Sequence, residues 1–132
     1  LRLGYGLCSD IRLLEKMHQM TQPWNVSVPA QFAGIAACEE DAFVEQTRVY
    51  IKNERMFLAE ALRALHFTVY DSQANYLFFE APKDLYDICN KEGILIRDCS
   101  NYRGLTQGYY RIAVKTRTEN EELIKVLLKY YN

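Results

Sequence analysis

The feature of this sequence that most constrains its fold is one long stripe of apolar side chains at helical spacing. The stripe runs through about six helical turns within residues 41–66, about twice the length of an average globular helix. Its members are Phe43, Thr47, Tyr50, Ile51, Phe57, Leu58, Ala61, Leu62 and Leu65. Only Glu54 interrupts the pattern. Because helices of this length often connect two domains, we expect residues 41–66 to form a bridging helix.

The segments before this stripe predict further helices. Ser9 and Asp10 are suited to cap a first helix, because their side chains can accept hydrogen bonds from the free backbone N–H groups of its first turn. Pro23 and Pro29 bound an extended loop, since proline blocks a helix and restricts the residue before it. Pro29 also suits the first turn of an alanine-rich helix that continues to Cys38.

The residues after the stripe predict a β-β-α-β-β-α order. The expected strands are residues 66–70, 76–80, 94–97 and 109–114. Gly93 marks the end of the helix between the second and third strands, and Thr118 and Glu121 form a T-x-x-E capping box for the closing helix. The fold class is therefore α/β, with an α+β small domain. We expect a small mixed or antiparallel sheet of about four strands, packed by helices and preceded by a helical segment.

Composition and charge exclude several classes of protein. Hydrophobic residues make up 49% of the 132 residues and charged residues 25%, as in a globular protein and unlike a disordered or collagen-like chain. No stretch reaches the roughly 18 apolar residues that a membrane-spanning helix needs. The net charge is -1, so nothing in the overall charge points to nucleic acid or to an anionic membrane as a partner.

The four cysteines point to neither disulfides nor a metal site. Cys8, Cys38, Cys89 and Cys99 are widely spaced and form no C-x-x-C pair. A chain of this size can build a core without a disulfide framework. We expect free thiols, buried or half-buried, in the reducing environment of the cytoplasm.

Two arginines lie in expected strands and are candidates for binding an anion. In residues 94–97, strand alternation places Arg97 opposite to the two isoleucines, and in residues 109–114 it turns Arg111 away from the apolar side chains beside it. A cation in the middle of a strand is costly unless that face meets water, a partner acid or an anionic ligand. A guanidinium can hold a carboxylate or phosphate with two parallel hydrogen bonds.

Spacing alone does not decide among these explanations. Arg111 and Arg97 could lie on a solvated face of the sheet or pair with a structural Asp or Glu. Arg2, in the short run that opens the chain, leaves the same alternatives open.

Five segments, in order, resemble one enzyme family. They are LRLGYG (1–6), QPWNVSVPAQFAG (22–34), ANYLFF (74–79), GILIRDCSNYRGL (93–105) and YYRIAVKTRTENEEL (109–123). Together they look like the C-terminal portion of a fold-type I, class I/II aminotransferase that depends on pyridoxal phosphate. The resemblance covers nearly the whole chain, and it is strongest to the branch with histidinol-phosphate aminotransferase and threonine-phosphate decarboxylase.

The resemblance implies a role for each arginine. In this family the position of Arg2 holds the cofactor phosphate, and the position of Arg111 binds the α-carboxylate of the substrate. The position of Arg97 provides a second contact to a substrate anion, usually a phosphate. Three further residues, which could approach the site or be purely structural, are Trp24, Asn25 and Asn75.

The resemblance also implies how the chain is organised. Residues 1–40 would be the tail of the large domain that binds pyridoxal phosphate, residues 41–66 the bridging helix, and residues 67–132 the small C-terminal domain. The Schiff-base lysine of the family lies roughly eight residues before the phosphate-binding arginine, which falls upstream of Leu1. We therefore expect no catalytic residue in this chain, no bound cofactor, and no activity from the chain alone.

The parent enzyme that the resemblance implies is a cytoplasmic homodimer. It would be an aminotransferase or a related decarboxylase that acts on a small phosphorylated or otherwise anionic amino acid. The alternative is a free-standing small domain that binds anions or a partner and does no chemistry.

Overall fold

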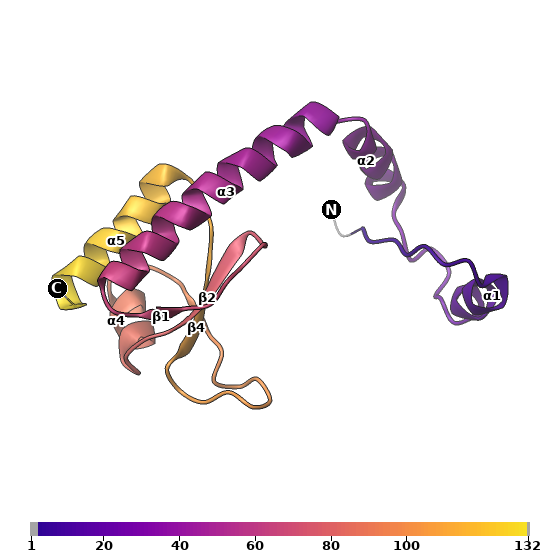
Figure 1. Cartoon of the computed structure of the whole chain (residues 1–132). Helices are drawn as coiled ribbons and strands as arrows, with labels where there is room; N and C mark the ends of the chain where they lie inside the picture. The colour runs from indigo at the N-terminus through magenta and orange to yellow at the C-terminus, as the bar shows by residue number, and fades with distance from the viewer. Residues whose placement is uncertain (1–2, 132) are drawn as a thin grey trace. The chain divides into compact units, whose positions relative to one another are not determined.

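The structure is a computed structural model that describes residues 3–131, and the chain divides into two compact units. The N-terminal unit comprises residues 1–45 and the C-terminal unit residues 46–132. The elements, labelled in Figure 1, are α1 (Ile11–Gln19), α2 (Val28–Cys38), α3 (Asp41–Ala64), β1 (Thr68–Val69), β2 (Tyr76–Glu80), α4 (Leu85–Lys91), β3 (Arg97–Asp98), β4 (Tyr109–Ala113) and α5 (Arg117–Tyr131). The boundary between the units falls within α3, so this helix contributes residues to both.

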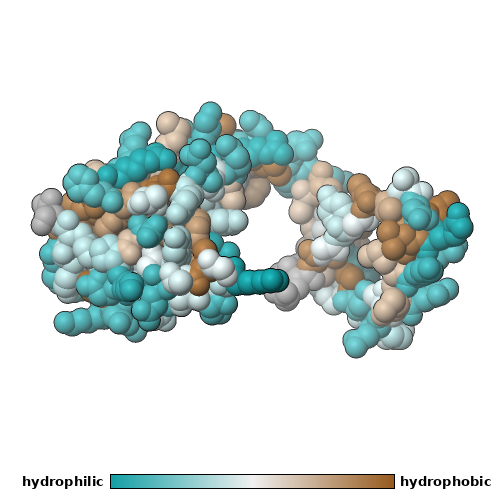
Figure 2. Space-filling view, turned by 60° about the horizontal axis from the view of Figure 1, so that its bottom comes forward, coloured by the Kyte–Doolittle hydropathy of each residue, from teal (hydrophilic) through white to brown (hydrophobic). Residues whose placement is uncertain are grey.

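The N-terminal unit contains the two capped helices that the sequence predicts. Asp10 Oδ1 accepts the backbone N–H of Arg12 at 2.9 Å and begins α1. Ser27 Oγ accepts the N–H of Ala30 at 3.4 Å at the start of α2, where proline occupies the first turn. Ala30 is the one buried residue among residues 3–45. Figure 2 shows hydrophobic side chains at the surface of this unit, so its apolar helix faces are not covered by the unit itself.

The C-terminal unit is built on a four-stranded antiparallel sheet with the strand order β1-β2-β4-β3. Helices α3, α4 and α5 cover one face of this sheet (Figure 1). The core between the layers contains Leu58, Leu62, Leu77, Phe79, Leu85, Cys89, Tyr110, Ile112, Leu123 and Leu127. The expected sheet of about four strands with packed helices is thus confirmed, and its pairing is antiparallel throughout.

The two edge strands are shorter than expected because each follows a helix that ends in a left-handed cap. His66 has φ 62°, and the next residue donates its N–H to the Leu62 carbonyl at 3.1 Å. Gly93 has φ 77°, and Ile94 donates to the Cys89 carbonyl at 2.8 Å. Both closures are Schellman motifs, which keep the following residues tied to the helix end. The chain therefore enters β1 and β3 later than the apolar pattern indicates.

Glu54 interrupts the apolar stripe of α3 with a buried carboxylate that binds two residues of α5. Its side chain is 5% exposed, and Oε1 accepts Nε and Nη2 of Arg117 at 3.0 and 2.9 Å. Oε2 accepts Nδ2 of Asn120 at 2.9 Å. The Arg117 guanidinium also lies 3.6 Å from the ring centroid of Phe57. These contacts join α3 to the start of α5.

The capping box of α5 lies two residues before the expected one. Glu119 accepts the N–H of Thr116 at 3.2 Å, and Thr116 Oγ1 accepts the N–H of Glu119 at 3.5 Å. Hydrogen bonds from Lys115 and then Thr116 lower the pKa of Glu119 to about 2. The expected box at Thr118 and Glu121 is wrong because the helix starts earlier. The Asn120 side chain accepts the backbone N–H of Lys115 and donates to the Lys115 carbonyl, which fixes the backbone just before α5.

Removing the charge of Glu54 should destabilise the chain. We expect Glu54→Gln to lower the free energy of unfolding by about 2–3 kcal/mol, less than the roughly 3–5 kcal/mol for a fully buried pair, because Arg117 is half-exposed. The exposed Glu60 on the same helix is the matched control, and Glu60→Gln should change stability by less than about 0.5 kcal/mol. Urea denaturation followed by circular dichroism measures both. Equal effects would contradict a stabilising role for the pair.

The four thiols are all free, but only two are buried. Cys8 and Cys38 are exposed, contrary to expectation, because the N-terminal unit buries so little. Cys89 and Cys99 are buried in the C-terminal unit. Burial raises the pKa of the Cys89 thiol to about 11 and also raises that of Cys99.

Thiol reactivity should therefore separate into two classes. At pH 8, Ellman's reagent should modify Cys8 and Cys38 quickly, while Cys89 and Cys99 react roughly a thousandfold more slowly, through opening of the fold. A chain with Cys8→Ser and Cys38→Ser should show no fast phase until denaturant is added. Fast modification of this double variant in its folded state would show that the thiols of the C-terminal unit are accessible.

Candidate functional site

The face of the sheet that the helices leave uncovered carries aromatic side chains and two arginines. Alternation along β4 buries Tyr110 and turns Arg111 to this open face. In the sheet register, Arg111 is opposite Phe78 of β2 on one side and Arg97 of β3 on the other. The Phe78 ring stacks on Tyr109 and Tyr70, with centroid distances of 5.8 and 5.2 Å. The strand faces predicted for both arginines are thus those in the structure.

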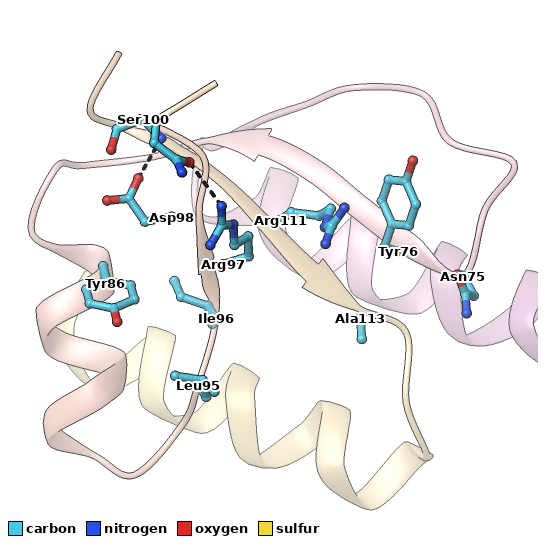
Figure 3. A pocket seen from close by; sticks show the side chains of 11 residues that line it. Asn75, Tyr76, Tyr86, Leu95, Ile96, Arg97, Asp98, Ser100, Arg111 and Ala113 are labelled. Atoms are coloured by element: carbon cyan, nitrogen blue, oxygen red, sulfur yellow. Dashed lines mark hydrogen bonds between the residues drawn. The ribbon is translucent and has the colours of Figure 1, made fainter. Parts of the chain in front are cut away.

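A cavity of about 770 Å³ lies around the edge strand β3 and takes in both arginines (Figure 3). Its lining residues are Asn75, Tyr76, Tyr86, Leu95, Ile96, Arg97, Asp98, Ser100, Asn101, Arg111 and Ala113. The lining therefore combines two positive charges and one carboxylate with tyrosine rings and small polar groups. Such a mixture suits a small ligand with more than one anionic group.

Neutral groups hold both guanidiniums. Arg97 is exposed; its Nη2 donates to Oδ1 of Asn101 at 3.0 Å, and its guanidinium lies 5.4 Å from the ring centroid of Tyr102. Arg111 is half-buried, with its guanidinium 5.0 Å from the ring centroid of Tyr76. Contacts of this kind orient a cation without cancelling its charge.

Within the described residues 3–131, neither arginine forms an ion pair with a carboxylate. The one acid that lines the cavity, Asp98, is paired in register with the inward-facing Tyr110 and accepts the N–H of Ser100 at 2.8 Å. A structural ion pair therefore does not explain Arg97 or Arg111. What remains is a site open to water or to an anionic ligand.

The electrostatics of the site favour an anion. Directly opposed residues of antiparallel strands have Cβ atoms about 4.5–5.5 Å apart, so the charges of Arg97 and Arg111 repel each other. The same charges act on Cys99: burial raises its pKa, and Arg111 and Arg97 oppose that rise. An anion bound between the two guanidiniums would relieve the repulsion.

The other residues singled out from the sequence differ in where they lie. Asn75 lines the cavity, and its carbonyl accepts the N–H of Val114 at 2.9 Å at the end of β4. Trp24 and Asn25 belong to the N-terminal unit, where Trp24 is 96% exposed. Arg2 lies outside the described residues.

Sequence reasoning missed several residues that line the cavity. Ser100 and Asn101 lie in the polar loop after β3, and only their position just after Arg97 could have drawn attention to them. Tyr86 comes from α4, so nothing in its local sequence indicates that it reaches the cavity. Among residues 3–131 there is no cluster of His, Cys, Asp and Glu that could hold a metal ion. Nor does any helix in that range have the length and apolar character to cross a membrane.

The sequence profile of the family described as "Aminotransferase class I and II" matches residues 1–127. The chain belongs to this family. The family that the five segments resemble is therefore confirmed, and the match extends over almost the full length of the chain.

Two curated relatives of this aminotransferase-family chain represent the two activities of the expected branch. The chain is 35% identical over 131 residues to threonine-phosphate decarboxylase from Salmonella typhimurium. It is 34% identical over 134 residues to histidinol-phosphate aminotransferase from Methanosphaera stadtmanae. Each alignment covers 96% of this chain and 36% of the relative, so the chain spans about a third of the length of these proteins.

A solved structure supports the same assignment for the fold. The crystal structure of histidinol-phosphate aminotransferase from Clostridium acetobutylicum superposes with a TM-score of 0.85 at 28% identity. The superposition covers 92% of this chain and 38% of the crystallised one. The arrangement of helices and strands described above is therefore that of part of an aminotransferase-family enzyme.

Proposed function

We propose that this chain is the C-terminal portion of a pyridoxal-phosphate-dependent enzyme of the histidinol-phosphate aminotransferase and threonine-phosphate decarboxylase type. Its part in the reaction is to recognise the anionic groups of a phosphorylated amino acid. The observation that supports this proposal is the pair Arg97 and Arg111, which are opposed on adjacent strands, line one cavity, and have no carboxylate partner within the described residues. Residues 1–40 would belong to the large domain, 41–66 to the bridging helix, and 67–132 to the small domain.

The surroundings of the two arginines support different roles. Arg111 lies in a central strand with hydrogen-bonded neighbours on both sides, so its position is the more rigid. This suits the α-carboxylate, whose orientation at Cα has to be fixed. Arg97 lies at the sheet edge and is more exposed, which suits the phosphate at the far end of a substrate. Both contacts would use the planar, bidentate geometry of guanidinium.

The described residues fit a substrate better than the cofactor ring. Pyridoxal phosphate requires a lysine for its covalent attachment and acts as the electron sink of the reaction. The lining of the cavity contains two arginines and no lysine among residues 3–131. The proposal therefore assigns binding and orientation of the substrate to this chain. The chain alone would be inactive, and Arg2 remains the residue predicted to hold the cofactor phosphate.

Orientation has a chemical consequence in such an enzyme. By holding the α-carboxylate, Arg111 would set which bond to Cα is oriented for cleavage, and so whether the proton or the carboxylate is lost; pyridoxal phosphate, when bound, would supply the electron sink. Both activities occur among the named relatives. The parent enzyme that we propose is a cytoplasmic homodimer, an assignment that rests on the resemblance alone.

The role of Arg111 can be tested with O-phospho-L-threonine, a ligand that carries both a carboxylate and a phosphate. We expect Arg111→Gln to weaken its binding by roughly 1.5–3 kcal/mol, about 10-fold to 150-fold, because a charge-assisted hydrogen bond is lost. Isothermal titration calorimetry on the 132-residue chain measures the affinity. Phosphoethanolamine, which lacks the carboxylate, should lose much less affinity with the same substitution.

Arg103 provides a matched control for this test. It is exposed, lies in the loop after β3 and does not line the cavity, so Arg103→Gln should leave both affinities unchanged. An unchanged affinity of the Arg111→Gln chain for O-phospho-L-threonine would remove Arg111 from its proposed role. If inorganic phosphate bound as tightly as O-phospho-L-threonine, the free-standing anion-binding domain would be the better description.

A further inference from the structure

The contacts of Arg97 single out one residue of the loop that follows β3. The Asn101 side chain accepts from Nη2 of Arg97 at 3.0 Å, and the ring of the next residue, Tyr102, lies under the same guanidinium (Figure 3 shows the hydrogen bond). An exposed arginine otherwise samples many rotamers, and fixing them costs binding free energy. These two contacts restrain one side of Arg97 and leave other donors of its guanidinium available to a ligand.

Asn101 is also part of the cavity wall. Its carbonyl oxygen is used by Arg97, while its amide nitrogen makes no hydrogen bond within the part of the chain that the structure describes. A ligand oxygen bound by Arg97 could accept from this nitrogen as well, because both groups line the same cavity. Asn101 therefore combines an acceptor for the arginine with a donor for the ligand.

From this arrangement we propose that Asn101 is a positioning residue that sets the preference of the site for a phosphate-bearing ligand. It orients Arg97 through a neutral oxygen, which keeps the full positive charge of the arginine available to the ligand. The proposal rests on the anion-binding function proposed above and names a residue on which the strength of that function depends.

The neutrality of Asn101 is the essential point. A carboxylate at this position would have the same shape and would bond Arg97 more strongly, but as an ion pair it would satisfy the cation. It would also place a negative charge beside the incoming phosphate. The acid that already lines the cavity, Asp98, is instead engaged by the backbone N–H of Ser100. Within the described residues, neither guanidinium therefore forms an ion pair with a carboxylate.

Isosteric substitution separates this proposal from a merely structural role. We expect Asn101→Asp to weaken binding of O-phospho-L-threonine by roughly tenfold or more, and Asn101→Ala by roughly threefold, while binding of L-threonine changes little. A structural role predicts the opposite order, because aspartate keeps the shape and the bond to Arg97. The matched control is Asn53→Asp, which makes the same charge change at an exposed position of α3 that does not line the cavity.

A second background tests whether Asn101 acts through Arg97. In a chain with Arg97→Gln, the further change Asn101→Ala should cost less affinity than it does in the wild-type background, since only the direct hydrogen bond from Asn101 to the ligand is left to lose. Calorimetry gives the affinities, and thermal unfolding shows that each variant is folded. An equal loss in both backgrounds, or Asn101→Asp binding like wild type, would overturn the assignment of Asn101.

The outcomes also distinguish this inference from the proposed function. If Arg97→Gln loses the preference for O-phospho-L-threonine over L-threonine but Asn101→Asp keeps it, the anion site is supported and the role of Asn101 is refuted. If the wild-type chain binds the two ligands equally, the phosphate-binding role of Arg97 itself fails, and the role of Asn101 fails with it.

Discussion

The pairing of β4 with both β2 and β3 is the constraint on which the rest of the C-terminal unit depends. Because strand side chains alternate between faces, burying Tyr110 and Ile112 under the helices forces Arg111 onto the open face. The same pairing fixes Arg97 opposite Arg111. A shift of one residue in register would place a guanidinium in the apolar core, so the hydrophobic packing that stabilises the fold also holds the arginines in place.

Much of this could be predicted from the sequence, since the signals are local. Alternation predicted the faces of Arg97 and Arg111, and capping residues predicted the helix starts to within a few residues. Register and burial depend on contacts distant in sequence, which local patterns do not contain. Glu54 looked like a break in the stripe because its partners lie more than sixty residues away, at Arg117 and Asn120. The proposed role of Asn101 depends on its hydrogen bond to Arg97 in the folded chain. The polar sequence around Asn101 does not indicate this contact.

The N-terminal unit shows that the helical periodicity of apolar residues does not determine whether they are buried. Its helices begin where the capping residues predict, yet their apolar faces are exposed, and among residues 3–45 only Ala30 is buried. An amphipathic pattern states which side of a helix can be buried and says nothing of what covers it. The cysteines follow the same rule: Cys8 and Cys38 were expected to be buried or half-buried and are exposed because this unit has little core.

Charged groups are paired in the core, whereas at the site two like charges lie opposite each other without an acidic partner among the described residues. In the core, the buried carboxylate of Glu54 is matched by Arg117 and Asn120, so the charge stabilises the contact between α3 and α5. On the open face, Arg97 and Arg111 are opposed with neutral restraints, an arrangement that costs stability in the free chain. An anion bound between the arginines, as proposed, would recover that cost, because a ligand that binds only the folded state stabilises it. The lack of an ion pair between a described carboxylate and either guanidinium would therefore contribute to the proposed specificity as much as the arginines themselves.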